Sequence, residues 1–523
     1  MRKYWPFQRT ETGVFILAST LALASFAIYI RLFFSYPIDD AYIHLRIARN
    51  FVEHGQPFFN SGEKVMGSAS HLWVNLAALL ISLEPKHLEY LRYPIFLFCS
   101  GTYFCCVSLL RWKFSPLKAA VIACALIHFV SLSSSTGMME VSLAMLLYFG
   151  CLVCYTKKQW LAVGFLSSLA IWTRPEFSIF FVTILFYAKD RSAQKKILLG
   201  FFPAATLYLF YVFYYFGTII PFPAISKQHV FKTTALSNFG NGAGATVLEI
   251  NWISRLLTMI GVNFHGWNNF FSMTVFLFFA GYLLWRSMQN GIASWVRVTV
   301  ISSLLLQLLY TGRGTTIFPW YVPLYLLPLG LASFLLLEKK FLLTYLLAGS
   351  LCYPVPVEIG LRNIYALITT KVYLQENYRL GGRVQQYLKI GEMLQQKMPN
   401  ATVMTPEIGG LGWAFHGKII DSAALVSPDF LKYYLNQTAK QAIERFFVRI
   451  PLAAIQEFNP DMIVGLNVWT TEVANAIKTG QLRGYHLVKS YPIVPPEQLR
   501  VGESVTFWGS SSIEVYAKNG TLL

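Results

Sequence analysis

The chain has 523 residues, of which 55% are hydrophobic and only 13% are charged. Soluble domains carry about 25% charged residues, so this composition excludes a soluble globular protein and indicates a membrane protein. The formal net charge is +18. Lys and Arg collect in the cytoplasmic loops of membrane proteins, and the sequence has no module of interleaved basic and aromatic residues, so nucleic acid is not an expected partner.

Apolar segments predict a polytopic α-helical protein that keeps its first helix. A helix needs about 20 predominantly apolar residues to cross a bilayer, and the N-terminal run is longer than the hydrophobic region of a cleaved signal peptide. We expect about eleven transmembrane helices, near residues 13–34, 90–110, 117–131, 141–155, 159–173, 177–188, 197–216, 266–285, 297–312, 320–337 and 340–355.

The short loops rich in Lys and Arg predict the orientation. They are residues 111–118, 156–159, 189–196, 285–297 and 338–340. The positive-inside rule puts them in the cytoplasm together with the N-terminus. The C-terminal region then lies on the extracytoplasmic side. We expect a multi-pass protein of a bacterial inner membrane.

The first outer loop, residues 35–89, contains two adjacent carboxylates, Asp39 and Asp40, at the start of an amphipathic helix. Ile43, Ile47 and Phe51 recur every four positions, as on the apolar face of a helix lying in the interface. One aspartate could cap this helix by accepting bonds from its free amides. Two adjacent aspartates leave one carboxylate for chemistry.

A further apolar segment of the first outer loop, residues 71–83, is too short to span comfortably. We expect it to form a re-entrant or interfacial helix on the outer face.

Polar residues of the later outer loops complete a candidate site. They are Glu140, Arg174, Glu176, Lys227 and Arg313. Ionisable groups near membrane depth are costly and are therefore functional candidates. The predicted orientation puts all of them on the face that holds Asp39 and Asp40, which predicts one outward-facing site.

The sequence changes character near residue 372, so we expect a transmembrane domain over residues 1–371 and an extracytoplasmic α/β domain over residues 372–523. Helical spacing marks residues 381–398. Strand patterns lie within residues 401–412, 418–426, 453–467, 485–494 and 504–518. A turn follows the first strand and contains Glu407, with His416 shortly after it.

The motifs of the first loop, DDAYIHLRIARNFVEHGQPFFNSGEKVMGSASHLW, resemble those of the GT-C superfamily of integral-membrane glycosyltransferases. The resemblance is nearest to the bacterial polyprenyl-phosphate-sugar-dependent branch that contains the mycobacterial arabinofuranosyltransferases. Further matching segments follow in order along the chain: GMME, TRPE, YFGTIIPFPAISK and PEIGGLGWAFHGKIIDSAALVSPD. The extra Met of GMME and the PWY sequence at 319–321 depart from the arabinosyltransferase pattern.

This resemblance implies transfer of a sugar from a polyprenyl-phosphate donor to an acceptor hydroxyl of a glycan, lipid or protein. A lipid phosphate is an adequate leaving group, so the enzyme needs a base for the acceptor and cations for the departing phosphate. Asp39 or Asp40 suits the base of an inverting displacement. The expected phosphate ligands are Lys227, Arg174 and Arg313. The residues expected to bind or orient substrate are His44, Arg46, Glu63, Glu140, Glu176, Glu407 and His416.

Two alternatives stay open. A lipid or solute transporter or flippase would also carry charged residues in its membrane domain, although transporters usually place their sites between internal repeats, and none is evident here. Alternatively, the acceptor is a protein. The first-loop histidines His44, His54 and His71 lack metal-ligand spacing, so no metal ligands are predicted. Dependence on Mg²⁺ or Mn²⁺ stays open.

Overall fold

The computed structural model describes residues 9–34, 37–84, 88–188, 190–232, 265–315, 317–337, 375–444, 447–494, 506–507 and 509–520. The chain divides into two compact units. The helical unit comprises Met1–Phe34, Tyr90–Phe210 and Thr234–Tyr373, and the sheet unit comprises Ser35–Glu89, Tyr211–Thr233 and Leu374–Leu523. The sheet unit therefore includes the first loop. The division predicted at residue 372 stays a prediction.

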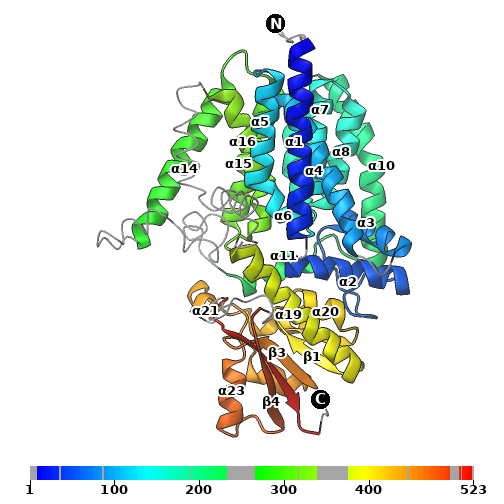
Figure 1. The fold of residues 1–523 in the computed structure, drawn as a ribbon, viewed down its shortest axis with the longest axis vertical. Helices are drawn as coiled ribbons and strands as arrows, with labels where there is room; N and C mark the ends of the chain where they lie inside the picture. The colour runs from blue at the N-terminus through cyan, green and yellow to red at the C-terminus, as the bar shows by residue number, and fades with distance from the viewer. Residues whose placement is uncertain are drawn as a thin grey trace. The chain divides into compact units, whose positions relative to one another are not determined.

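Long apolar sequences form the helices of the helical unit (Figure 1). They are α1 (Arg9–Phe33), α4 (Arg92–Leu110), α5 (Pro116–Leu126), α6 (Leu132–Thr136), α7 (Val141–Thr156), α8 (Trp160–Thr173), α9 (Ser178–Tyr187), α10 (Arg191–Phe216), α14 (His265–Met288), α15 (Ser294–Gly312) and α16 (Pro323–Leu336), with a π-helical turn at Ile127–Ser131. The last residues of α10 belong to the sheet unit.

The first ten predicted spans fall on these helices, and the eleventh, 340–355, lies outside the described residues. By length and composition, four described segments can cross a membrane: Glu11–Phe33, Leu88–Leu110, Arg191–Phe216 and Ser294–Gly312. Further apolar helices in the described ranges, such as α7 and α16, have only 10–17 residues. Integral membrane character is thus supported, whereas a count of eleven spans is not confirmed.

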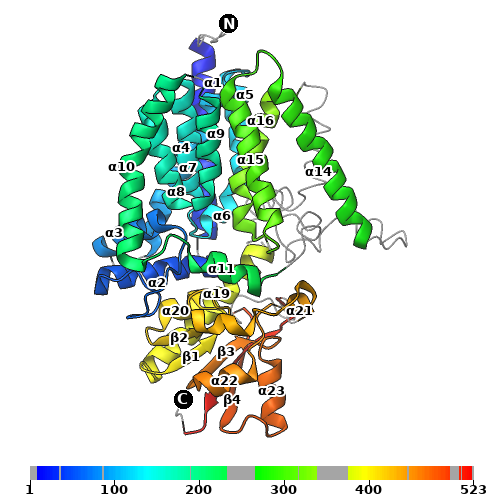
Figure 2. The same ribbon diagram turned by 180° about the vertical axis from the view of Figure 1, so that it is seen from behind.

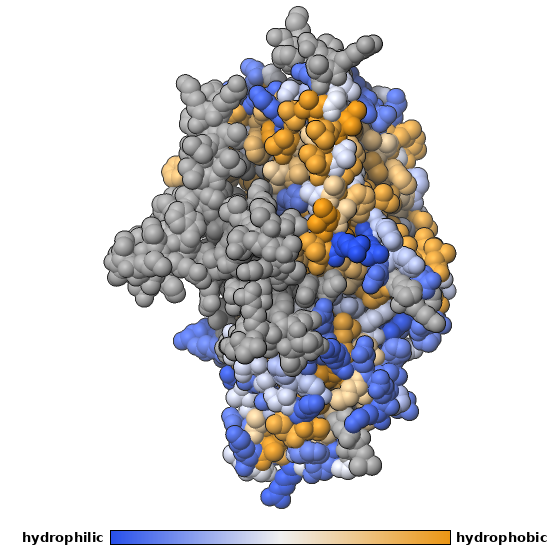
Figure 3. Space-filling view, in the orientation of Figure 1, coloured by the Kyte–Doolittle hydropathy of each residue, from blue (hydrophilic) through white to orange (hydrophobic). Residues whose placement is uncertain are grey.

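Apolar side chains cover exposed surface of the helical unit (Figure 3). On α1 they include Val14, Ile16, Leu17, Leu21 and Ile28, each about half exposed. An apolar surface of this kind on a soluble protein would promote association. On a membrane helix it faces lipid, which is how we interpret it.

Helices α8 and α10 pack at close range (Figure 2). A Cβ atom added at Gly164 would lie 1.9 Å from the carbonyl oxygen of Ile197, and one added at Gly200 would lie 2.1 Å from that of Leu161. Small residues let the backbones of membrane helices approach closely. Such packing matters in a bilayer, because the apolar lipid supplies little hydrophobic drive for helix association. The two glycines therefore fix this helix pair.

The sheet unit begins with two helices of the first loop, α2 (Asp39–His54) and α3 (His71–Leu83), and includes the short helix α11 (Phe222–Val230). Its remaining elements are α19 (Gln375–Lys397), β1 (Thr402–Thr405), α20 (Gly409–Ala414), β2 (Lys418–Asp421), η5 (Pro428–Tyr433), α21 (Ala439–Glu444), α22 (Leu452–Phe458), β3 (Met462–Leu466), α23 (Thr471–Lys478), β4 (Tyr485–Pro492) and β5 (Ser512–Lys518). The predicted α/β character of the C-terminal region is confirmed.

The strands form one mixed sheet in the order β2-β1-β3-β5-β4. β1 runs parallel to β2 and β3, whereas β5 runs antiparallel to β3 and β4. The chain leaves β1 for β2 on one side and then returns to β3 on the other. The strand order thus reverses beside β1. In parallel sheets, the loop that follows a strand at such a point lies at a crevice. That loop leads into α20.

The polar face of α2 is buried, not solvated. His44, Arg46, Arg49 and Asn50 each have less than a tenth of their surface exposed. The helix packs against α3 and α20 within the sheet unit (Figure 1). A helix was predicted to start at Asp39, as α2 does, but its polar face serves as a contact surface for the C-terminal residues.

Candidate active site

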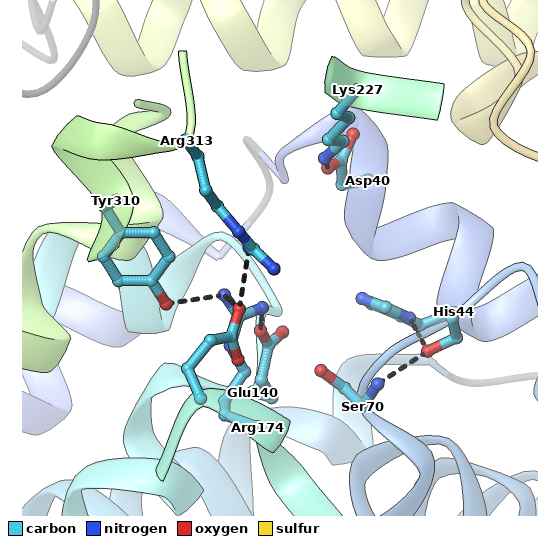
Figure 4. A network of polar contacts seen from close by, with 10 residues as sticks. Asp40, His44, Ser70, Glu140, Arg174, Lys227, Tyr310 and Arg313 are labelled. Carbon is cyan, nitrogen blue, oxygen red and sulfur yellow. Dashed lines mark hydrogen bonds and ion pairs between the residues drawn. The ribbon is translucent and has the colours of Figure 1, made fainter. Parts of the chain in front are cut away.

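Asp40 and Lys227 form an ion pair in the sheet unit, with 3.4 Å between the Lys227 Nζ and Asp40 Oδ2 atoms. Asp40 lies in the first turn of α2, and Lys227 lies in the last turn of α11. Their side chains are 23% and 15% exposed, so both groups remain within reach of a ligand. Figure 4 shows the two side chains pointing toward each other. The sequence predicts a base role for Asp40 and a phosphate-binding role for Lys227, and the fold brings the two residues together.

Asp39 is placed differently from its neighbour. Its Oδ2 accepts a hydrogen bond from the Gly409 amide at 2.9 Å, and its Oδ1 accepts one from the Gly410 amide at 2.8 Å. The residue before α2, Ile38, is its N-cap and makes no side-chain cap bond. The alternative that one aspartate caps its own helix is therefore wrong for Asp39, because both of its oxygens bind amides of α20.

The buried Arg383 places a positive charge close enough to Asp39 to act on its carboxylate. Arg383 of α19 forms an ion pair with Glu407, and its guanidinium stacks 4.2 Å from the ring centre of Phe507. Burial raises the pKa of the Asp39 carboxyl, while the charge of Arg383 and the two amides oppose that shift. Burial lowers the pKa of Arg383, and Asp39 opposes it. Each of the two charges thus favours the ionised form of the other.

Arg46 uses all five of its N–H groups on protein acceptors. They donate to the carbonyl oxygens of Phe59, Gly412, Phe415 and Gly417 and to Asn60 Oδ1 at 2.8–3.3 Å. An arginine has five such donors, so none remains for substrate. Burial lowers the pKa of Arg46 to about 9. Its predicted substrate-orienting role stays a prediction, and its contacts are those of a structural residue.

Three other predicted orienting residues of the sheet unit have protein partners. His44 Nδ1 lies 2.9 Å from Ser68 Oγ (Figure 4), and Glu63 pairs with Lys418 at 2.8 Å. His416 Nε2 lies 2.9 Å from an Arg49 nitrogen, and it is exposed. Burial lowers the pKa of His416, and the charge of Arg49 acts in the same direction. The substrate-orienting roles expected of these three residues stay predictions.

Asp421, at the end of β2, holds the loop that follows it. Its carboxylate accepts bonds from the amides of Ala423, Leu425 and Val426 at 2.5–2.9 Å. Burial raises the pKa of Asp421 to about 7, because desolvation outweighs these three bonds. This carboxylate is fully used by the backbone of its own loop.

Within the helical unit, the predicted residues form a charge-balanced cluster. Arg174 Nη1 lies 2.7 Å from Glu140 Oε1, and Arg174 Nη2 lies 3.5 Å from Glu176 Oε1. Arg313 lies 3.8 Å from the same Glu176 oxygen. Figure 4 shows the Arg313 and Tyr310 contacts of this group. Two cations meet two carboxylates, so the cluster has no excess positive charge for a phosphate.

Aromatic rings enclose Arg174. Its guanidinium lies 4.5 Å from the ring centre of Tyr321, and its Nη2 donates to the Tyr310 hydroxyl at 3.3 Å. The rings of Tyr310 and Tyr321 stack almost in parallel, 5.3 Å apart. Glu140 and Glu176 thus both pair with Arg174, and their predicted substrate-orienting role stays a prediction. A phosphate-binding role for Arg174 and Arg313 stays a prediction.

Sequence reasoning missed Arg383. The pattern of residues 381–398 predicts only a helix, although a buried arginine must find acceptors for its N–H groups, often a carboxylate. That need for a partner was the available signal, and Glu407 of the PEIGG turn was already a candidate residue. Among the residues that the structure describes, no group of three or more His, Cys, Asp or Glu side chains is arranged to hold a metal ion.

The apolar helices and the mixed sheet define a multi-span integral membrane protein with a C-terminal α/β region. Residues 373–516 match a family described as a domain of unknown function (DUF8728). No curated protein matches the sequence.

Among solved structures, the chain is similar to one titled "Single-Particle Cryo-EM Structure of Arabinofuranosyltransferase AftD from Mycobacteria". The identity is 14% and the TM-score is 0.46. The match covers 95% of this chain and 40% of that one, so this chain spans well under half of that protein's length.

Proposed function

We propose that the protein is a membrane glycosyltransferase that moves a sugar from a polyprenyl-phosphate donor to an acceptor hydroxyl on the extracytoplasmic face. The observation that carries this proposal is the Asp40–Lys227 pair, in which a carboxylate and an ammonium group lie 3.4 Å apart and partly exposed. The first-loop motifs that resemble GT-C enzymes contain this same Asp40. The chemistry needs one base and one phosphate-binding cation, and this pair supplies both.

In the proposed reaction, the Asp40 carboxylate takes the proton of the acceptor hydroxyl. The acceptor oxygen then attacks the anomeric carbon of the sugar, and the bond from that carbon to the phosphate oxygen breaks. The polyprenyl phosphate leaves with the bonding electrons, and Lys227 stabilises its added negative charge. Proton, sugar and charge are thus all accounted for.

The ion pair also links the two roles. A donor phosphate competes with Asp40 for the Lys227 ammonium group, because both are anions within reach of one flexible side chain. Donor binding thereby releases the carboxylate that must accept the proton. Base activation is then coupled to the arrival of the donor, which limits wasteful hydrolysis.

The fate of the donor separates this proposal from a transporter or flippase. Purified protein in liposomes is incubated with a polyprenyl-phosphate sugar labelled in the sugar and with an extract of envelope lipids and glycans. A transferase produces free polyprenyl phosphate together with labelled acceptor. Movement of intact donor across the bilayer, with no cleavage, would instead establish transport and overturn the proposal.

A further inference from the structure

The two adjacent aspartates of α2 have different environments within the sheet unit. Asp39 is buried, with 9% of its surface exposed, and both carboxylate oxygens accept backbone amides. The Asp40 side chain is 23% exposed and points to Lys227. The two carboxylates therefore differ in role: the contacts of Asp39 are those of a structural residue, and those of Asp40 suit a residue that reacts.

Asp39 acts as a cap for a helix more than 350 residues away in the sequence. The first amides of any helix lack partners within it, and the positive end of the helix dipole favours a carboxylate there. α20 has only six residues, Gly409–Ala414. A helix this short is not stable alone, so its contacts with α2 determine whether it forms.

The opposite end of α20 is bound by the same helix of the first loop. Arg46 donates to the carbonyl oxygens of Gly412 and Phe415, and Arg49 donates to that of Trp413 at 2.9 Å. Cations favour the carbonyl end of a helix. α2 thus supplies an anion at the start of α20 and two cations at its end, which fixes both the position and the direction of α20.

Glycine at position 409 is required for this contact. A Cβ atom added there would lie 1.9 Å from the Asp39 carbonyl oxygen and 2.7 Å from Asp39 Cγ. Both are closer than real Cβ contacts, and the nearer atom is backbone. The turn after β1 therefore approaches α2 through a position that has no side chain.

From these contacts we propose that Asp39 is a positioning residue: docked on the Gly409 and Gly410 amides, it fixes the first turn of α2 so that Asp40 faces Lys227. This inference rests on the proposed function, in which Asp40 is the base. It assigns the C-terminal α/β region a part in the reaction. The loop after β1, at the point where the strand order reverses, thus leads into amides that bind the Asp39 carboxylate.

The docking contact is tested first without any activity measurement. Hydrogen exchange at Gly409 and Gly410 is followed in the purified full-length protein and in Asp39→Asn. The amide side chain retains one acceptor oxygen and presents an N–H₂ group to the second amide. We expect exchange at these amides to accelerate about 10- to 150-fold, the equivalent of losing about 1.5–3 kcal/mol from a charge-assisted bond. Unchanged protection would overturn the docking.

Kinetics then separate positioning from proton transfer. Gly409→Ala keeps both carboxylates but disrupts the contact, so we expect it to lower kcat as Asp39→Asn does. The double variant should lose no more than the more severe single variant, because both changes break one interaction. Gly281→Ala, whose added Cβ meets nothing within 4 Å, is the matched control and should keep wild-type turnover.

The pH profile gives the decisive difference. If Asp40 is the base, the residual activity of Asp39→Asn and of Gly409→Ala still falls toward acid, as in the wild type. Loss of that acidic limb in Asp39→Asn would make Asp39 the base and contradict the inference. Full turnover in both variants would also contradict it. A wild-type protein that transfers no sugar would refute the proposed function, while hydrogen exchange would still decide the docking.

Discussion

The two polar clusters of this molecule differ in how their charges are satisfied. In the helical unit, Arg174 and Arg313 meet Glu140 and Glu176 directly, and the charges balance. In the sheet unit, the carboxylates of Asp39, Asp40 and Glu407 outnumber the cations Arg383 and Lys227. The cluster of the helical unit neutralises its own charges, whereas the cluster of the sheet unit includes the partly exposed Asp40–Lys227 pair. Ionisable groups in a membrane protein are functional candidates, and their partners help to decide which of them act in chemistry.

The largest expected effect is that of Asp40→Asn. The amide keeps the shape of the side chain but cannot take the proton, and a general base contributes about 10²–10⁴-fold. We expect turnover to fall by that factor while the melting temperature stays near the wild-type value. Steady-state transfer rates and thermal unfolding in detergent measure the two. Full turnover in the variant would place the base elsewhere.

The helical cluster should respond in stability, not in chemistry. Arg174→Leu leaves the buried Glu140 and Glu176 with less compensating charge, and breaking a buried pair typically costs about 3–5 kcal/mol. We expect a clear drop in melting temperature and in folded yield. The double variant Arg174→Leu/Glu140→Leu removes one charge of each sign and should recover part of the loss. A single variant that is fully stable but does not bind donor would show that Arg174 serves the phosphate instead.

Lys227→Ala should weaken donor binding by a smaller factor. A hydrogen bond to a charged group contributes about 1.5–3 kcal/mol, which is about 10- to 150-fold in affinity. Titration with a short-chain prenyl-phosphate sugar measures the donor, and acceptor binding should be spared. Lys227→Arg is the matched control that keeps the charge. Equal donor affinity in wild type and Lys227→Ala would remove this residue from the site.

The smallest expected effect is that of Lys418→Ala. Its pair with Glu63 is solvent-accessible, with side chains 58% and 34% exposed. Exposed pairs of this kind contribute about 0–1 kcal/mol. We expect turnover and melting temperature close to those of the wild type. A large loss of turnover would indicate that Glu63 must be held in place for substrate.

Local patterns in the sequence predicted the helices and strands well, because apolar runs and alternation act over a few residues. The bounds 71–83 and the start of a helix at Asp39 were predicted correctly. Contacts between distant segments were not predictable in the same way. The Asp39–Gly409 bond joins residues 370 positions apart, and no local pattern encodes it.

The division of labour between Asp39 and Asp40 was also outside the reach of the sequence. Two adjacent aspartates look equivalent until the neighbours of each are known. Arg383 shows the same limit, since its partner Glu407 lies in a turn whose approach to α19 depends on the fold of the whole sheet unit. The helical cluster was easier, because Arg174 and Glu176 are close in sequence.

The central claim, that this protein handles a polyprenyl-phosphate sugar, is tested most directly by the lipid it selects. Purified protein in detergent is exposed to a total prenyl-lipid extract, recovered, and analysed by mass spectrometry beside Lys227→Ala. We predict enrichment of a polyprenyl-monophosphate sugar by the wild type and its loss in the variant. Recovery of bulk phospholipid alone, equal for both proteins, would contradict the claim.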